Sequence, residues 1–161
     1  MNDYTLLLAL HIASVILLLG VGGGSAFYKY MADRSGKLEV ILHTNKLVVL
    51  ADWLFTTPAI LLQPLTGWML VSLSGLPLST PWIYHSIILY LFAVGLWLIA
   101  VWIQIRMKNL AKKAKETRIP LDKQYQTLMS AWIFLGMLSF TAMLFIFLLM
   151  FFKENFFLYT L

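Results

Sequence analysis

Long stretches without a charged residue constrain this chain more than any other feature of its sequence. No Asp, Glu, Lys or Arg occurs from Tyr4 to Tyr28 or from Gln124 to Phe152. Between Lys46 and Arg106 the only such residue is Asp52. A helix that crosses a bilayer needs about 20 consecutive, mainly apolar residues. These stretches therefore predict an integral membrane protein.

The segment from Leu73 to Pro81 (LSGLPLSTP) is rich in turn residues and divides the central apolar stretch into two spans. We predict an all-α bundle of four transmembrane helices that forms one domain over residues 1–161. The spans are expected near residues 4–24, 53–73, 81–103 and 131–152. The chain start lacks the basic region of a signal peptide, so the first span is expected to be retained.

The basic residues predict the orientation of the bundle. Eleven of the twelve Lys and Arg lie within residues 29–46 and 106–123, next to the first and third loops. The positive-inside rule places these loops in the cytoplasm and both termini outside, in a multi-pass protein of the bacterial inner membrane. The net charge of +5 therefore indicates anionic lipid headgroups as a partner rather than nucleic acid.

Several classes of site are excluded by residue content. The chain has no cysteine, so it has no disulfide, no thiolate nucleophile and no cysteine-ligated metal. Three well-separated histidines and one intramembrane carboxylate do not give the spacing of a zinc site. Phosphate-binding and nucleophile-elbow motifs are absent.

Polar and small residues recur at helical spacing on one face of three spans. Such residues are costly in hydrocarbon and are expected to face the bundle interior, where small ones allow close helix packing. Pro58 and Pro64 should also free backbone carbonyls in the second span. The three faces comprise Asp52, Thr56, Ala59, Gln63, Thr66 and Gly67; Ser86, Tyr90, Ala93, Trp97, Ala100 and Gln104; and Trp132, Gly136, Ser139 and Met143.

Asp52, Gln104 and Arg106 are expected at the same depth, at the cytoplasmic boundary of the membrane. One interpretation is an Asp52–Arg106 ion pair that fixes the helix register. The other is a role in the uptake of a proton or a substrate. The sequence leaves both open.

His11 lies about 10 Å below the outer end of the first span and needs a partner at that depth. One candidate partner is haem iron, for which imidazole is a usual axial ligand. The other is a hydrogen bond to Gln63 or Tyr90. His85 is the candidate second axial ligand, and Trp97 completes the predicted cofactor-binding set. Any cofactor is expected in the outer half of the bundle.

Several segments resemble the DUF2269-type predicted integral membrane proteins. They are residues 48–58 (VVLADWLFTTP), 63–67 (QPLTG), 89–90, Trp97 and 101–106 (VWIQIR). This resemblance covers nearly the whole chain and implies a four-helix membrane fold.

A more distant resemblance is to the HemJ-type protoporphyrinogen oxidases, which are four-helix membrane proteins associated with haem b. It is carried by residues 9–12 (ALHI) and by the pair Gly67-Trp68. It implies that His11 is the axial haem ligand and that the protein oxidises a porphyrinogen. The lysine that this family carries early in its third helix corresponds to Ser86 here. CopD-type membrane proteins are similar at the same distance.

Three functions follow as hypotheses. The first is a haem b protein with a redox role, acting on a quinone or a porphyrin-like substrate, either as a HemJ-like oxidoreductase or as an electron carrier. The second is a non-catalytic partner in the assembly of a membrane complex. The third is a small transporter or channel subunit with a polar path from Asp52 to Gln63, expected to form a homo-oligomer because four helices are few for a transporter.

Overall fold

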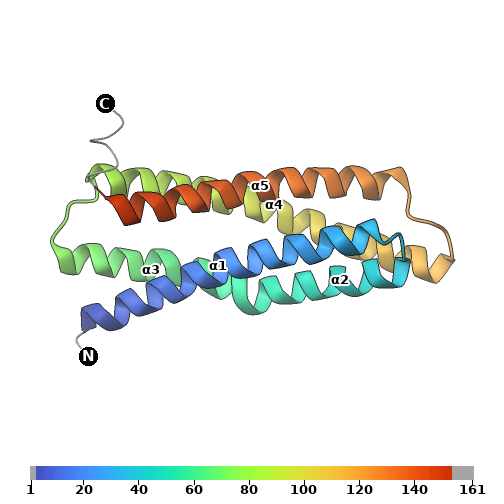
Figure 1. Cartoon of the computed structure of the whole chain (residues 1–161), viewed down its shortest axis with the longest axis horizontal. Coiled ribbons are helices and arrows are strands. Elements are labelled where there is room, and N and C mark those ends of the chain that lie inside the picture. The colour runs from blue at the N-terminus through green and yellow to red at the C-terminus, as the bar shows by residue number, and fades with distance from the viewer. Residues whose placement is uncertain (1–2, 154–161) are drawn as a thin grey trace.

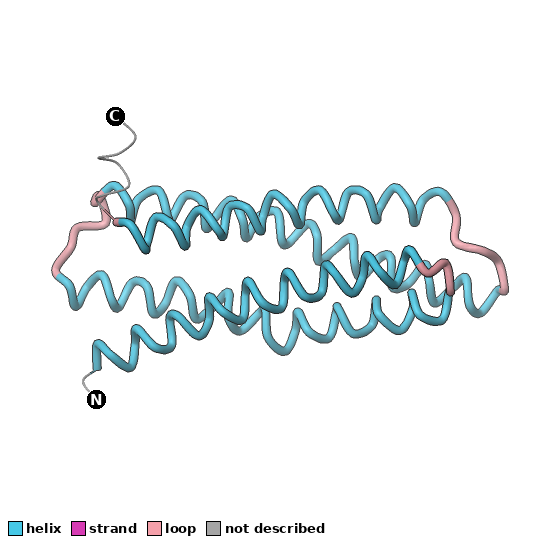
Figure 2. The backbone as a smooth tube through the Cα atoms, in the orientation of Figure 1, coloured by secondary structure: helices cyan, strands magenta, loops and turns pink. Residues whose placement is uncertain are grey.

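The computed structural model describes residues 3–153, which are helical almost throughout (Figure 1, Figure 2). No strand occurs within that range, so the predicted all-α fold is confirmed. The π-helical turn η1 joins α2 to α3, so that these three elements form one continuous helix. The elements are α1 (Asp3–Arg34), α2 (Leu38–Ala51), η1 (Asp52–Thr56), α3 (Thr57–Ser74), α4 (Pro81–Thr117) and α5 (Lys123–Phe152).

Within residues 3–153, four helices are long and apolar enough to cross a membrane, with α2, η1 and α3 counted as one. They have 30 to 37 residues, which corresponds to roughly 45–55 Å at 1.5 Å per residue and exceeds a hydrocarbon core of about 30 Å. The helices therefore extend beyond the predicted spans. The second begins at Leu38, before the span expected near residues 53–73, and the third continues to Thr117, beyond the span expected near residues 81–103.

Both ends of the described chain lie at the same end of the bundle, which we call the terminal end (Figure 1). The loops at residues 35–37 and 118–122 lie at the opposite end, which we call the basic end (Figure 2). This arrangement agrees with the predicted up-and-down order of the spans. The assignment of the basic end to the cytoplasm stays a prediction from the positive-inside rule.

The helices pack in two pairs. α1 packs along α3, and α4 packs along α5, while α2 contacts both α1 and α4. Toward the basic end, α2, α4 and α5 share a core of buried side chains, which explains why these helices continue beyond the length that a membrane span needs. That core includes Ile41, Leu42, Val48, Ile103, Met107, Ala111, Tyr125, Met129 and Trp132.

The second membrane helix is irregular in its middle. In the π-helical turn, the backbone N–H of Thr57 donates to the carbonyl of Asp52. Such turns are rare in proteins overall, and those that occur are often found at functional sites. About two turns later, Pro64 has no N–H to donate to the carbonyl of Ile60. The hydroxyl of Tyr90 on α4 donates to that carbonyl instead, as expected for a backbone acceptor freed by proline.

Candidate functional site

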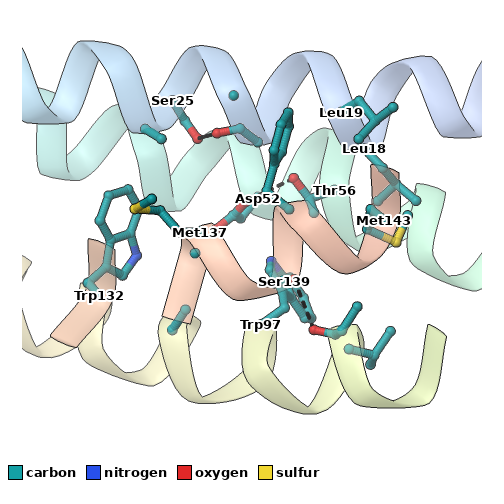
Figure 3. A pocket seen from close by; sticks show the side chains of 18 of the residues that line it. Leu18, Leu19, Ser25, Asp52, Thr56, Trp97, Trp132, Met137, Ser139 and Met143 are labelled. Carbon is teal, nitrogen blue, oxygen red and sulfur yellow. Dashed lines mark hydrogen bonds between the residues drawn. The ribbon is translucent and has the colours of Figure 1, made fainter. Parts of the chain in front are cut away.

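A cavity of about 360 Å³ lies between the two helix pairs (Figure 3). Its walls are mostly apolar, with side chains such as Leu18, Val94, Ile133 and Phe140. Small residues provide part of the space. A Cβ added at Gly136, for example, would meet no atom within 4 Å apart from its own helix backbone. The cavity is partly open to the surroundings of the bundle, and it is much larger than the gaps that side-chain packing normally leaves.

One end of the cavity is polar and is organised around Asp52. The hydroxyl of Thr56 donates to Asp52 Oδ1 at 2.8 Å, and Gln104 Nε2 donates to Asp52 Oδ2. The Gln104 amide oxygen in turn accepts from Trp132 Nε1 at 3.1 Å. Each carboxylate oxygen therefore accepts a hydrogen bond, and η1, α4 and α5 are joined at this point.

Trp97 lies beside this carboxylate and also lines the cavity. Its buried Nε1 atom interacts with the Asp52 carboxylate, outside the geometry of a regular hydrogen bond. Figure 3 shows Trp97, Asp52, Thr56 and Trp132 around the same space.

The predicted polar faces of the third and fourth spans do face this cavity. Tyr90, Trp97 and Gln104 on α4, and Gly136 and Met143 on α5, all line it.

The predicted face of the second span divides between two environments. Asp52 and Thr56 line the cavity, whereas the buried Gln63 and Thr66 contact His11 on α1. The side chains between Asp52 and Gln63 therefore do not form one continuous polar path.

The suggested pair between Asp52 and Arg106 is not formed. Asp52 interacts with Gln104 and Thr56, whereas the Arg106 guanidinium lies 5.6 Å from the centre of the Trp102 ring. Residues two positions apart on a helix point in different directions, so Gln104 and Arg106 cannot both face the same carboxylate. The exposed Arg106 side chain is directed outward, at a depth where headgroups can solvate it.

His11 is buried in the seam between α1 and α3, with both ring nitrogens hydrogen-bonded. Thr66 Oγ1 donates to the Leu62 carbonyl at 2.7 Å, so it accepts from His11 Nδ1 at 2.9 Å. His11 Nε2 then accepts from Gln63 Nε2 at 3.1 Å. The Gln63 amide oxygen is contacted by the Ser14 hydroxyl. This network has a donor and an acceptor at each step and needs no cofactor.

Haem ligation by His11 stays a prediction, but His11 and His85 do not lie in positions that fit a haem group. The lone pair of His11 Nε2 that iron would require is directed at Gln63, and His11 does not line the cavity. His85 is an exposed residue of α4 whose Nδ1 lies 2.7 Å from the Pro81 carbonyl. Within residues 3–153 no cluster of three metal-ligating His, Asp or Glu side chains occurs.

We accordingly expect the purified protein to show no reduced-minus-oxidised absorption band of haem b. The expectation follows from the two hydrogen bonds of the His11 ring, which leave no nitrogen for iron. The measurement is a visible spectrum of the detergent-purified protein, repeated with His11→Ala. A band that is present in the wild type and absent from His11→Ala would contradict this expectation and would support the axial ligand.

A second polar cluster was not predicted, and it surrounds Lys29. This side chain is only 1% exposed. Its ammonium group donates to Asn45 Oδ1 and lies 3.6 Å from Asp33 Oδ2. Tyr125 donates from its hydroxyl to Asp33 Oδ1 at 2.8 Å and accepts from Asn45 Nδ2 at 3.1 Å. The ammonium also lies 5.5 Å from the centre of the Trp132 ring.

The Lys29 cluster joins α1, α2 and α5, and through Trp132 it borders the polar end of the cavity. From the sequence alone, Lys29 is counted only as one of the basic residues near a loop. Two features of the sequence could have indicated that it belongs to a buried polar cluster. Lys29 and Asp33 are one helical turn apart at the end of a charge-free stretch, and Asn45 interrupts an otherwise apolar helix face.

Comparisons with known proteins agree with this architecture. The chain matches the family described as "Predicted integral membrane protein (DUF2269)" over residues 5–154. No curated protein and no solved structure matches. The family match covers nearly the whole chain and includes every residue of the cavity and of the two polar networks. The chain therefore belongs to the DUF2269 family of predicted integral membrane proteins.

Proposed function

We propose that this protein binds a lipid-soluble small molecule inside the membrane, in the cavity between its two helix pairs. The observation that carries the proposal is the cavity itself, which has apolar walls and one polar end (Figure 3). Its volume of about 360 Å³ lies in the range of small-molecule sites, roughly 300–1,000 Å³. Apolar walls with a few converging polar groups are typical of such sites.

The position of the cavity favours a ligand taken from the bilayer. It reaches along α4 from Tyr90 to Gln104, a distance of roughly 21 Å at 1.5 Å per residue. The polar end, at Asp52 and Gln104, is the end nearer the basic loops. A molecule with an apolar tail and a small polar head would match this arrangement, with its head near the membrane boundary. Quinones belong to this class, so a redox role is one form that the function could take.

The proposal is tested by filling the cavity. Leucine at position 136 would project into the space and exclude the ligand, and the open surroundings of Gly136 should accept the side chain without backbone strain. Gly95 on α4 is the matched control, because a Cβ there also meets no atom within 4 Å while the residue is exposed and lies outside the cavity. Both changes replace a helical glycine by the same residue.

The measurement is the melting temperature of the detergent-purified protein, titrated with decylubiquinone and, separately, with decylbenzene. A bound ligand stabilises the folded state by about 2.7 kcal/mol when its concentration is 100 times its Kd. We expect at least one probe to raise the melting temperature of the wild type and of Gly95→Leu, and not of Gly136→Leu. The same rise in Gly136→Leu, or no rise in the wild type with either probe, would contradict the proposal.

A further inference from the structure

We propose that the ligand is an organic cation, an ammonium group on an apolar body, and that the Asp52 carboxylate binds the ammonium group at the polar end of the cavity. This inference rests on the proposed function, because it assigns the chemical class of the molecule bound in the same space. It is carried by a carboxylate on the wall of a mostly apolar cavity, for which the described residues supply no cationic partner (Figure 3).

The first argument concerns the charge of Asp52. Among the residues of the described chain that line the cavity, it is the only Asp, Glu, Lys or Arg. The ion pairs within residues 3–153 involve three other acids, which are Asp33, Glu39 and Glu116. The buried Lys29 ammonium is paired with Asp33 rather than with Asp52. Charged groups inside a membrane bundle usually pair with one another, so a cation from outside the chain would complete this site.

The second argument concerns the groups that surround the carboxylate. Thr56 and Gln104 donate to it, and the Trp97 indole N–H interacts with it as well. Hydrogen bonds to a carboxylate favour its ionised form. These donors are neutral, however, and therefore do not cancel its charge. A carboxylate has about four lone-pair sites, so three donors leave room for one N–H of an ammonium group.

The surroundings favour an organic cation over a metal ion. Hard metal cations need several oxygen ligands, whereas the groups that contact Asp52 direct N–H and O–H donors toward it. No cluster of three metal-ligating His, Asp or Glu side chains occurs in the described part of the chain. The apolar walls, with side chains such as Leu18, Val94 and Ile133, would instead hold an alkyl or aromatic body.

The test compares decylammonium with 1-decanol, two probes of equal chain length, at pH 7 in the same detergent. A primary amine is charged at this pH, because its pKa is near 10, and the alcohol is neutral. Asp52→Asn keeps the shape of the side chain and removes its charge. Glu39→Gln is the matched control, because it makes the same change at an exposed residue of α2 that does not line the cavity. The Kd of each probe is obtained from the concentration dependence of the melting temperature.

We expect the wild type to bind decylammonium more tightly than decanol. Asp52→Asn should reduce this preference roughly tenfold, the lower range of the coupling between close charge pairs, and should change the affinity for decanol much less. Asp52→Glu keeps the charge and should keep the preference, and Glu39→Gln should bind both probes as the wild type does. A preference lost in Asp52→Glu as well as in Asp52→Asn would assign the effect to shape and would overturn the role of the charge.

The outcomes separate this inference from the proposed function. If the wild type binds both probes equally, or if Asp52→Asn weakens both equally, the cationic head is overturned while the cavity remains a ligand site. The first of these comparisons uses the wild type alone and does not depend on the folding of a variant. If the wild type binds decylubiquinone or decylbenzene but not decylammonium, this inference alone fails. If it binds none of the four probes, the proposed function fails, and this inference fails with it.

Discussion

Replacing Lys29 by methionine is expected to destabilise the folded protein by about 3–5 kcal/mol, the usual cost of removing one member of a buried ion pair. Methionine has a similar length and fills the space, so packing is largely kept. What is lost is the charge that compensates Asp33 and the donor to Asn45. The Asp33 carboxylate would retain only the hydrogen bond from Tyr125.

The measurement is the melting temperature of the detergent-purified variant, together with its yield as a monodisperse species. Lys37→Met is the control, since this lysine is exposed in the loop after α1 and its loss should have little effect. The double variant Lys29→Met with Asp33→Asn removes both charges and should recover part of the lost stability. A melting temperature of Lys29→Met equal to that of Lys37→Met would contradict the role of the buried pair.

Replacing Gln63 by leucine is expected to cost about 1–3 kcal/mol, the penalty for a buried polar group that loses its partner. Leucine has nearly the same size as glutamine, so the seam between α1 and α3 stays filled. His11 Nε2 loses its donor, whereas the Ser14 hydroxyl still lies 2.8 Å from the His11 carbonyl. The cost should therefore come mainly from the histidine ring.

The melting temperature again gives the readout, with Ser72→Ala as the control. Ser72 donates to a carbonyl on an exposed part of α3, so its loss should change the melting temperature little. His11→Leu combined with Gln63→Leu removes both partners of one hydrogen bond and should be less destabilising than the sum of the two single changes. Additive effects would show that His11 and Gln63 do not act together.

Much of the candidate site follows from residue spacing within single helices. The faces that contain Tyr90, Trp97 and Gln104, or Gly136 and Met143, are recognisable because polar and small residues repeat with the period of a helix. The hydrogen bond between His11 and Gln63 is also one of the two alternatives left open by the sequence. The extent of the second and third membrane helices was less predictable, because residues 38–51 and 104–117 contain charged residues and their apolar faces are buried only in the core that α2, α4 and α5 share.

The sequence by itself determined that the chain has four membrane helices, which face of three of them carries the polar and small residues, and that its basic residues gather at one end of the bundle. These properties depend on hydrophobic length, period and charge, which are local along the chain. Only the tertiary structure decided that Asp52 pairs with Gln104 rather than Arg106, that Lys29 is buried, and that a cavity separates the helix pairs. Each of these depends on the rotation and offset of one helix against another, and a few degrees of rotation change which side chains meet.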